Sequence, residues 1–254
     1  MPAALLSRRW LGFTALVLTL VAAFVLLGRW QLHRGEARHE RNATVRANLD
    51  AAPVPAETVL AADHGVAKAD VWRRVTATGR YDGAHAMVVR NRTLEGSPGF
   101  QVLVPLQIAS GPAVLVDRGW VPVGESSRDL PAVPAAPDGL VTVVGHVRAS
   151  EAAHRGAAPP AGQLAAIDVP GIARTLPYPL LDGYLELSQE TPRPGDAPRL
   201  LPTPELGAGP HFFYALQWWT FALIAVVGYV VLGRREVADA AGQPVGTVQP
   251  SRTA

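Results

Sequence analysis

The chain has 254 residues, of which 48% belong to the hydrophobic set and only 17% are charged. Ordinary soluble domains carry about 25% charged residues, so this composition excludes a disordered or fibrous chain and favours a membrane protein. The absence of Cys excludes disulfides, thiolate metal sites and iron–sulfur clusters. The net charge of +2 comes from scattered arginines, with Lys68 as the single lysine, which argues against nucleic acid as a partner.

Two apolar segments are long enough to cross a bilayer. Residues 10–30 contain an uncharged stretch with a Trp at either end, and residues 211–232 form a second apolar run that precedes a pair of arginines. About 20 residues of helix measure roughly 30 Å, the thickness of the hydrocarbon core. Aromatic residues crowd the start of the second segment, as expected at a membrane interface. We predict a transmembrane helix in each segment and the lipid bilayer as a partner.

The first segment is interpreted as a retained anchor. Ser7-Arg8-Arg9-Trp10-Leu11 has some likeness to a twin-arginine signal, but Gly28-Arg29-Trp30 is no small-x-small cleavage site. Two spans place both termini on one side of the membrane. The arginines after the second span favour the cytoplasm, whereas the four arginines between positions 29 and 41, which follow the first span, taken alone favour the opposite orientation, a rule that long translocated domains weaken; we place both termini in the cytoplasm. The predicted organisation in chain order is a cytoplasmic N-terminus 1–9, a transmembrane helix 10–30, an extracytoplasmic domain 31–210, a transmembrane helix 211–232 and a cytoplasmic disordered tail 233–254.

The domain between the spans is predicted to be mainly β, with a barrel-like or packed-sheet fold. Runs rich in Val, Leu and aromatic residues recur between turn residues, as in strands. The predicted strands are 71–81, 86–90, 100–108, 113–117, 140–147 and 184–188. Residues 35–49 are predicted to be a helix that extends from the first span, and the Pro- and Ala-rich pieces 51–56, 131–139, 157–162 and 191–210 are predicted loops.

Catalytic signatures are missing from the sequence, so we expect a protein that is not an enzyme. It has no phosphate loop, no Gly-x-Ser-x-Gly elbow and no His-Glu-x-x-His motif, and Gly96-Ser97-Pro98-Gly99 is interpreted as a turn. The seven histidines are too dispersed in sequence to indicate a metal site, and His33 and His39 lack ligand spacing on one helical face.

His211 is a candidate site residue because it opens the second span. Placing an ionisable group at or just inside the membrane boundary costs free energy, so such a residue is a candidate for a functional role. In helical register Tyr214, Ala215 and Trp218 follow it on one face, a stripe that could hold the edge of a haem while the imidazole binds iron. The alternative is an interfacial polar residue beside an aromatic belt.

Two further motifs admit a structural or a functional reading. Asp117-Arg118-Gly119-Trp120 is predicted to end a strand, either as a presented recognition corner or as a strand end pinned by the packing of Trp120. Gly28-Arg29-Trp30-Gln31, followed by Arg34, marks the exit of the first span with an interfacial Trp and snorkelling arginines.

Several short motifs occur together in a fixed order between the two spans. They are Gly28-x-Trp30-Gln31-x-x-Arg34, Asn91-Arg92-Thr93, Gly96-x-Pro98-Gly99-Phe100 with Val104-Pro105-Leu106, Val116-Asp117-Arg118-Gly119-Trp120-Val121-Pro122, and His211-x-x-Tyr214-Ala215-x-Gln217-Trp218. This set resembles the Surfeit locus protein one family of cytochrome c oxidase assembly factors. The resemblance covers about residues 10–235 and is weaker from 150 to 210.

The resemblance implies a multi-pass protein of a bacterial plasma membrane with its β-rich domain on the outer side. It implies a role in the maturation of cytochrome c oxidase subunit I, with haem a as a transient cofactor and haem a synthase as a further partner. Carried onto this chain, it makes His211 the haem iron ligand, with Tyr214 and Trp218 as haem contacts. It makes Trp30, Gln31, Arg34, Asp117, Arg118, Gly119 and Trp120 structural or partner-binding motif residues.

Two alternatives to a haem carrier remain open on the sequence. One is a purely structural chaperone that clamps newly inserted subunit I without touching haem. The other is a membrane-tethered binding or sensor domain unrelated to respiration. A transporter is the weakest reading, because two spans form no pore unless several copies assemble.

Overall fold

The computed structural model describes residues 7–62, 64–109, 111–124, 131–153, 156, 159–160 and 162–242. The chain divides into two compact units, one made of residues 1–41 with 207–254 and the other of residues 42–206. We call the first the helix pair and the second the β domain. Residues 233–242 are helical, so the predicted disordered tail 233–254 is wrong over this part. The rest of that tail, most of the predicted N-terminal segment and part of the predicted loop 157–162 lie outside the described residues.

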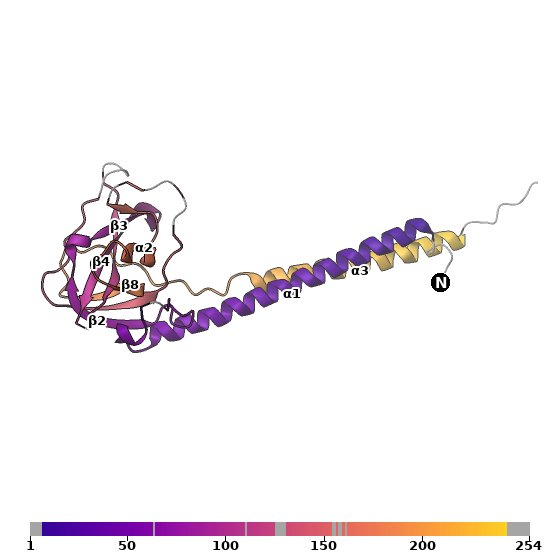
Figure 1. Ribbon diagram of the computed structural model, residues 1–254. Helices are drawn as coiled ribbons and strands as arrows, with labels where there is room; N and C mark the ends of the chain where they lie inside the picture. The colour runs from indigo at the N-terminus through magenta and orange to yellow at the C-terminus, as the bar shows by residue number, and fades with distance from the viewer. Residues whose placement is uncertain are drawn as a thin grey trace, which may run out of the picture. The chain divides into compact units, whose positions relative to one another are not determined.

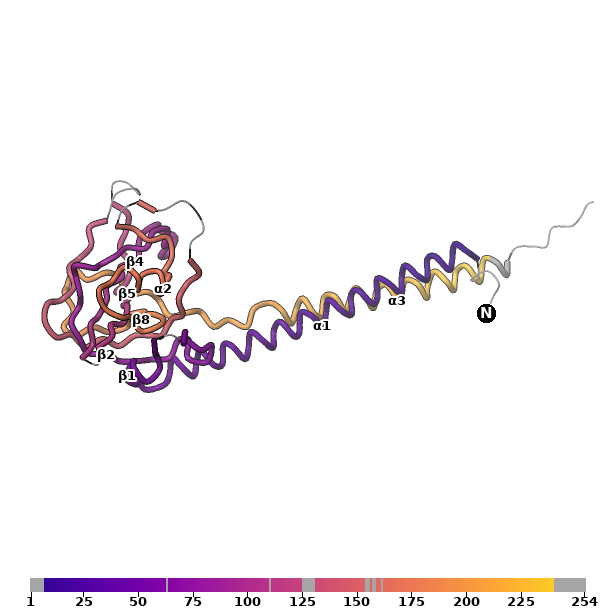
Figure 2. The backbone as a smooth tube through the Cα atoms, in the orientation of Figure 1, coloured from indigo at the N-terminus to yellow at the C-terminus, as the bar shows by residue number. Residues whose placement is uncertain are grey.

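The helix pair consists of the long helices α1 (Arg8–Asp50) and α3 (His211–Gly242). Both are long and apolar enough to cross a membrane. Helix α1 continues without a break to Asp50, which confirms the predicted helix over 35–49 and joins it to the first apolar segment. In Figures 1 and 2 the two helices run side by side in opposite directions.

Contacts along the whole pair fix this antiparallel packing. Near the start of α1, Thr14 Oγ1 lies 2.8 Å from the Tyr229 hydroxyl, and farther along the Phe24 ring stacks on Trp218 at 5.8 Å between centroids. Gly28 is buried, and a Cβ at this position would overlap the indole of Trp219. Gly28 is therefore the point where the two helices need the smallest possible side chain.

The β domain contains one sheet of eight strands within the described residues. The strands and short helices are β1 (Val54–Pro55), β2 (Arg74–Tyr81), β3 (Met87–Leu94), β4 (Ser97–Ile108), β5 (Ala113–Pro122), β6 (Val141–Arg148), β7 (Gln163–Leu164), α2 (Val169–Ala173) and β8 (Leu180–Thr191), with 3-10 turns at Ala56–Thr58 and Gly83–His85. The hydrogen-bonded order is β1-β2-β6-β8-β5-β4-β3-β7, and β2 also pairs with β4. Five strands, β2, β6, β8, β5 and β4, thus form a closed ring.

The apolar residues follow this ring. One buried cluster takes side chains from all five ring strands, with Val75, Leu106, Val116, Val143 and Leu185 as one member from each. A second cluster packs β3, β4, β5 and β8 against the short helix α2. Because alternate residues of a strand point to opposite faces, the ring encloses one cluster and α2 covers the other.

All six predicted strands are present, and most extend beyond their predicted ends. The largest difference is β8, predicted as 184–188 and found from Leu180 to Thr191. Ser97, Pro98 and Gly99 were predicted to lie in a turn, but they open β4, and the turn lies at Glu95 and Gly96. The predicted loop 51–56 contains the short strand β1.

Helix α2 was missed by the sequence analysis, although its signal is present. The Asp168 carboxylate accepts hydrogen bonds from the Gly171 backbone, and a proline occupies the first helical turn. An Asp cap followed by Pro is a typical helix start.

Candidate functional site

The local chain geometry fixes the place of His211 on the helix pair. Gly209 has a φ of +72°, which turns the chain just before α3, and the Tyr214 N–H donates to the Pro210 carbonyl at 3.1 Å. On α1, the Arg38 guanidinium Nε donates to the Gly207 carbonyl at 2.8 Å and holds the incoming segment against the helix. His211 therefore enters α3 at a defined height along α1.

The imidazole of His211 is oriented by Gln31. His211 Nδ1 lies 3.1 Å from Gln31 Oε1, and the carbonyl oxygen of an amide only accepts, so Nδ1 is the donor. In a neutral imidazole this places the proton on Nδ1 and leaves a lone pair on Nε2. Histidines that bind metals generally donate their second ring nitrogen to such an oxygen, and this arrangement is the one required of an iron ligand.

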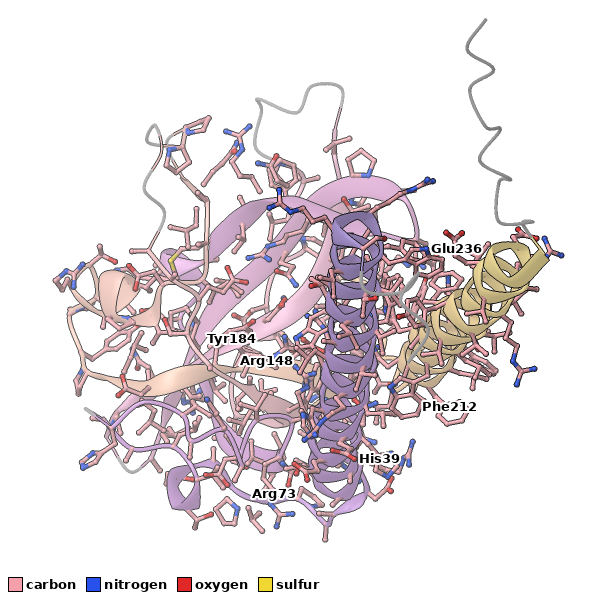
Figure 3. All side chains as sticks on the ribbon, turned by 90° about the vertical axis from the view of Figure 1, so that its right-hand side faces the viewer. His39, Arg73, Arg148, Tyr184, Phe212 and Glu236 are labelled. Carbon is pink, nitrogen blue, oxygen red and sulfur yellow. The ribbon has the colours of Figure 1, made fainter. Side chains whose placement is uncertain are left out.

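A hollow of about 380 Å³ lies beside His211 on the helix pair. Its walls include Gly35 and His39 from α1, and Gly209 and Phe212 from the α3 side. A Cβ on Gly35 would lie 3.3 Å from the His211 Cβ, and one on Gly209 would lie 3.3 Å from Nε2. Both glycines therefore lie close to His211, where a larger residue would crowd its Cβ and its Nε2 edge. Figure 3 shows His39 on α1 and Phe212 on α3.

His39 and His211 line the same hollow although 172 positions separate them in the sequence. Sequence spacing gave no indication of this proximity, because it depends on the antiparallel pairing of two helices at opposite ends of the chain. Within the described residues, no group of three or more His, Cys, Asp or Glu side chains could hold a metal ion. A metal held here needs ligands beyond the protein, as the iron of a haem has.

The stripe below His211 does not form a second wall of this hollow. Ala215 and Ala222 are fully or almost fully buried in the helix pair, and the Trp218 ring stacks on Phe24 of α1. Tyr214 is 47% exposed and lies outside the hollow. Ala215 and Trp218 therefore pack against α1, and the contact of this stripe with a haem stays a prediction.

Trp30 and Arg34 face away from the helix contact. Trp30 is 51% exposed, and the Arg34 guanidinium lies 5.3 Å from the centre of its ring. An aromatic ring with a cation over it at the end of an apolar segment fits the interfacial anchor that the sequence indicated. In this motif, Gly28 and Gln31 face the partner helix, whereas Trp30 faces outward.

The motif Asp117-Arg118-Gly119-Trp120 lies inside β5 and does not end it. The strand continues to Pro122, and the register with β4 shifts at this point, so that Arg118 is the extra residue of a β-bulge. Gly119 has a φ of +127°, and a Cβ here would overlap the Arg199 backbone. The bulge needs glycine at that position.

Arg118 is wholly buried and belongs to an internal ion pair. Its Nε and Nη2 donate to the two carboxylate oxygens of Glu190 in β8, each at 3.0 Å. The Tyr81 hydroxyl donates to the same carboxylate at 2.8 Å, and its ring lies 5.3 Å below the guanidinium. Trp120 is also buried and donates its indole N–H to the Arg92 carbonyl. An exposed recognition corner is therefore wrong for this motif, and its residues stabilise the bulge from within.

A second polar cluster follows from the same bulge. Asp117 is buried, accepts from the Gly119 N–H at 3.1 Å, and has no partner for Oδ2 among the described residues. Burial raises the pKa of the Asp117 carboxyl well above its usual range, and the nearby Glu186 carboxylate adds to this effect. Burial also raises the pKa of Glu186, although its ion pair with Arg148 at 2.8 Å opposes the shift. Figure 3 labels Arg148 with Tyr184 in this part of the β domain.

The cluster extends to Trp72, which has an unusual backbone. Its φ is +70°, rare for a bulky residue, and the Arg148 guanidinium lies 4.0 Å from its ring centre. Burial lowers the pKa of the adjacent His146, and the positive charges of Arg74 and Arg148 lower it further.

A β domain inserted between two antiparallel helices that are long and apolar enough to cross a membrane suggests a membrane-associated protein. A family model described as the SURF1 family matches residues 18–223, from within α1 to within α3. The chain belongs to the SURF1 family, known as cytochrome oxidase assembly factors, and this confirms the resemblance found in the sequence motifs.

Relatives support this membership over almost the whole chain. Uncharacterised SURF1-like proteins of Mycobacterium bovis and Mycobacterium tuberculosis are each 33% identical over 249 residues, which is 95% of this chain and 90% of theirs. A SURF1-like protein of Monosiga brevicollis is 26% identical over 243 residues, or 90% of each chain. Membership of this family suggests a respiratory oxidase as the kind of partner.

Proposed function

We propose that this protein binds haem a through His211 and passes it to subunit I during the maturation of cytochrome c oxidase. In this proposal α1 and α3 span a bacterial plasma membrane, both termini are cytoplasmic, and the β domain, a small barrel built on the five-strand ring, lies outside. The single observation that carries the ligand assignment is the Nδ1 contact with Gln31, which leaves Nε2 available on the side of an open hollow.

The geometry favours transfer over storage. Of the two imidazoles that line the hollow, only that of His211 is oriented by a described hydrogen bond, so one positioned protein bond to iron is expected, whereas two strong ligands in a closed pocket would slow release. Gly35 and Gly209 leave room for a planar group beside the ring. The α1 residues that line the hollow come directly after the apolar stretch of this helix. An apolar cargo would therefore meet the protein at the edge of the bilayer.

The test is an optical spectrum of the full chain purified in detergent after co-expression with haem a synthesis. The reduced-minus-oxidised spectrum is compared for the wild type, His211→Ala, Gln31→Leu and the control His33→Ala. His33 lies on α1 but does not line the hollow. We expect a haem a band in the wild type and in His33→Ala, and its loss in His211→Ala.

For Gln31→Leu we expect haem affinity to fall by about 10- to 100-fold, the usual cost of removing a hydrogen-bond partner of a metal-binding histidine. A full band in His211→Ala would overturn the ligand assignment. No band in the wild type, with oxidase still failing to assemble in cells that lack the protein, would favour a structural chaperone of subunit I. Intact oxidase in such cells would favour a binding or sensor domain unrelated to respiration.

A further inference from the structure

A second hollow lies at the opposite end of the helix pair from His211. It measures about 490 Å³ and is lined by Arg9, Trp10 and Phe13 near the start of α1 and by Leu232, Arg235, Glu236 and Asp239 in α3. Figures 1 and 2 show the start of α1 beside the last turns of α3, and Figure 3 labels Glu236. Nothing in the haem proposal uses these residues.

The inner wall of this hollow is aromatic and fixed in place. Trp10 is only 8% exposed and meets the Tyr229 ring edge to face at 6.0 Å, while Phe13 stacks on Tyr229 at 5.8 Å. The hydroxyl of Tyr229 is bonded to Thr14, so the ring is held at both its face and its tip. The wall is thus an apolar support that does not need to rearrange to accept a ligand.

The rim carries two guanidinium groups and two carboxylates. In the part of the chain that the structure describes, the side chains of Arg9, Arg235, Glu236 and Asp239 form no ion pair or hydrogen bond with one another or with other residues. Four unpaired charges of both signs around one hollow match a ligand that carries a negative and a positive group a few bonds apart.

We propose that this hollow binds the headgroup of phosphatidylethanolamine, with the phosphate on Arg9 and Arg235 and the ammonium on Glu236 and Asp239. The proposal rests on the membrane placement of α1 and α3 given above. The hollow lies where the apolar stretches give way to the arginine-flanked helix ends, the depth of lipid headgroups on the cytoplasmic side. An anionic lipid without an amine would leave both carboxylates unpaired beside its own negative charge.

The chain offers a matched control for this site. Arg8 and Arg234 are exposed, adjacent in sequence to Arg9 and Arg235, and outside the hollow. The double variants R9Q/R235Q and R8Q/R234Q therefore remove the same charge at the same helix ends. A non-specific attraction of arginines to lipid phosphates would weaken equally in both, whereas a built site would weaken only in the first.

The experiment measures the lipids that the full chain retains from vesicles of equal parts phosphatidylethanolamine and phosphatidylglycerol, by native mass spectrometry. We expect preferential retention of phosphatidylethanolamine by the wild type, about a tenfold loss in R9Q/R235Q, and less than a twofold change in R8Q/R234Q. E236Q/D239N is expected to lose the preference and to retain phosphatidylglycerol at least as well. Circular dichroism of each variant verifies that helix content is unchanged.

Three results would overturn the proposal. Equal retention of the two lipids by the wild type would exclude a site for the ethanolamine headgroup, and a preference for phosphatidylglycerol would make the hollow an anionic-lipid site. An equal loss in both arginine variants would reduce the effect to diffuse attraction. A chain that does not fractionate with membranes would instead refute the placement of the helices, so that the two failures are distinguishable.

Discussion

The buried ion pair between Arg118 and Glu190 leads to a sharp prediction about the β domain. Both side chains are fully buried, and Arg118→Ala would leave the Glu190 carboxylate with the Tyr81 hydroxyl as a hydrogen-bond donor and with Arg193, whose Nη1 lies 3.8 Å from Oε2, as a more distant cation. Removing one partner of a buried pair costs about 3–5 kcal/mol, a large share of the 5–15 kcal/mol that holds a typical domain folded. We therefore expect Arg118→Ala to destabilise the β domain severely.

Amide hydrogen exchange of β5 and β8, read by mass spectrometry on the full chain in detergent, measures this effect in the β domain alone. A loss of about 3–5 kcal/mol corresponds to exchange faster by roughly two to three and a half powers of ten for amides that exchange through global opening. The matched control is Arg118→Met with Glu190→Met, which removes both charges and keeps apolar volume. Because such replacements are often neutral or stabilising, the double variant is expected to exchange within about tenfold of the wild type.

Two outcomes would refute this reasoning. Exchange in Arg118→Ala that is less than tenfold faster than in the wild type would mean that the uncompensated carboxylate costs little. A double variant as unstable as Arg118→Ala would mean that the shape of the two side chains, and not their charge, holds the bulge.

Two further predictions concern the helix pair and the response to pH. Gly28→Ala should lower the melting temperature of the helix pair because the added Cβ would overlap the Trp219 indole. Gly12→Ala is the control, because no atom lies within 4 Å of its added Cβ, and it should leave the melting temperature unchanged. Equal melting temperatures of the two variants would contradict the packing at Gly28. The folded state raises the pKa of Asp117, so it binds more protons than the unfolded state above the unfolded pKa, and this group's contribution to stability falls as pH rises through the folded pKa. Asp117→Asn should therefore make urea unfolding less dependent on pH above the unfolded pKa of about 4, and an unchanged dependence would show that the buried carboxyl is not the group that titrates.

Much of the fold could be predicted from sequence because its strands and helices are marked locally. Apolar runs between turn residues located six strands, and an uncharged stretch located the core of α1. The ends of β8 were missed because its outer residues make their contacts with β5 and β6, and polar residues such as Asp182 and Glu190 interrupt its apolar pattern there.

The candidate site was predictable only in part, for a physical reason. The position of His211 at the start of an apolar segment marked it, but its partner Gln31 lies 180 residues earlier and is brought to it by helix packing. Helical periodicity placed Ala215 and Trp218 on one face of the second helix, but it could not show that the first helix packs against them. Arg118 was misplaced for a similar reason, because its partner Glu190 lies on a strand 72 residues away.

The position of β8 in the ring has a consequence for how the protein is made. β8 is the last strand in the chain, yet it lies between β5 and β6 and is the strand that closes the ring. A nascent chain that ends at β6 leaves one edge of β5 and one edge of β6 unpaired. The domain therefore cannot complete its fold until β8 has been synthesised. A premature stop anywhere before Leu180 removes the middle of the sheet, so nonsense and frameshift alleles across this gene are expected to be equally null, however late they fall before that codon.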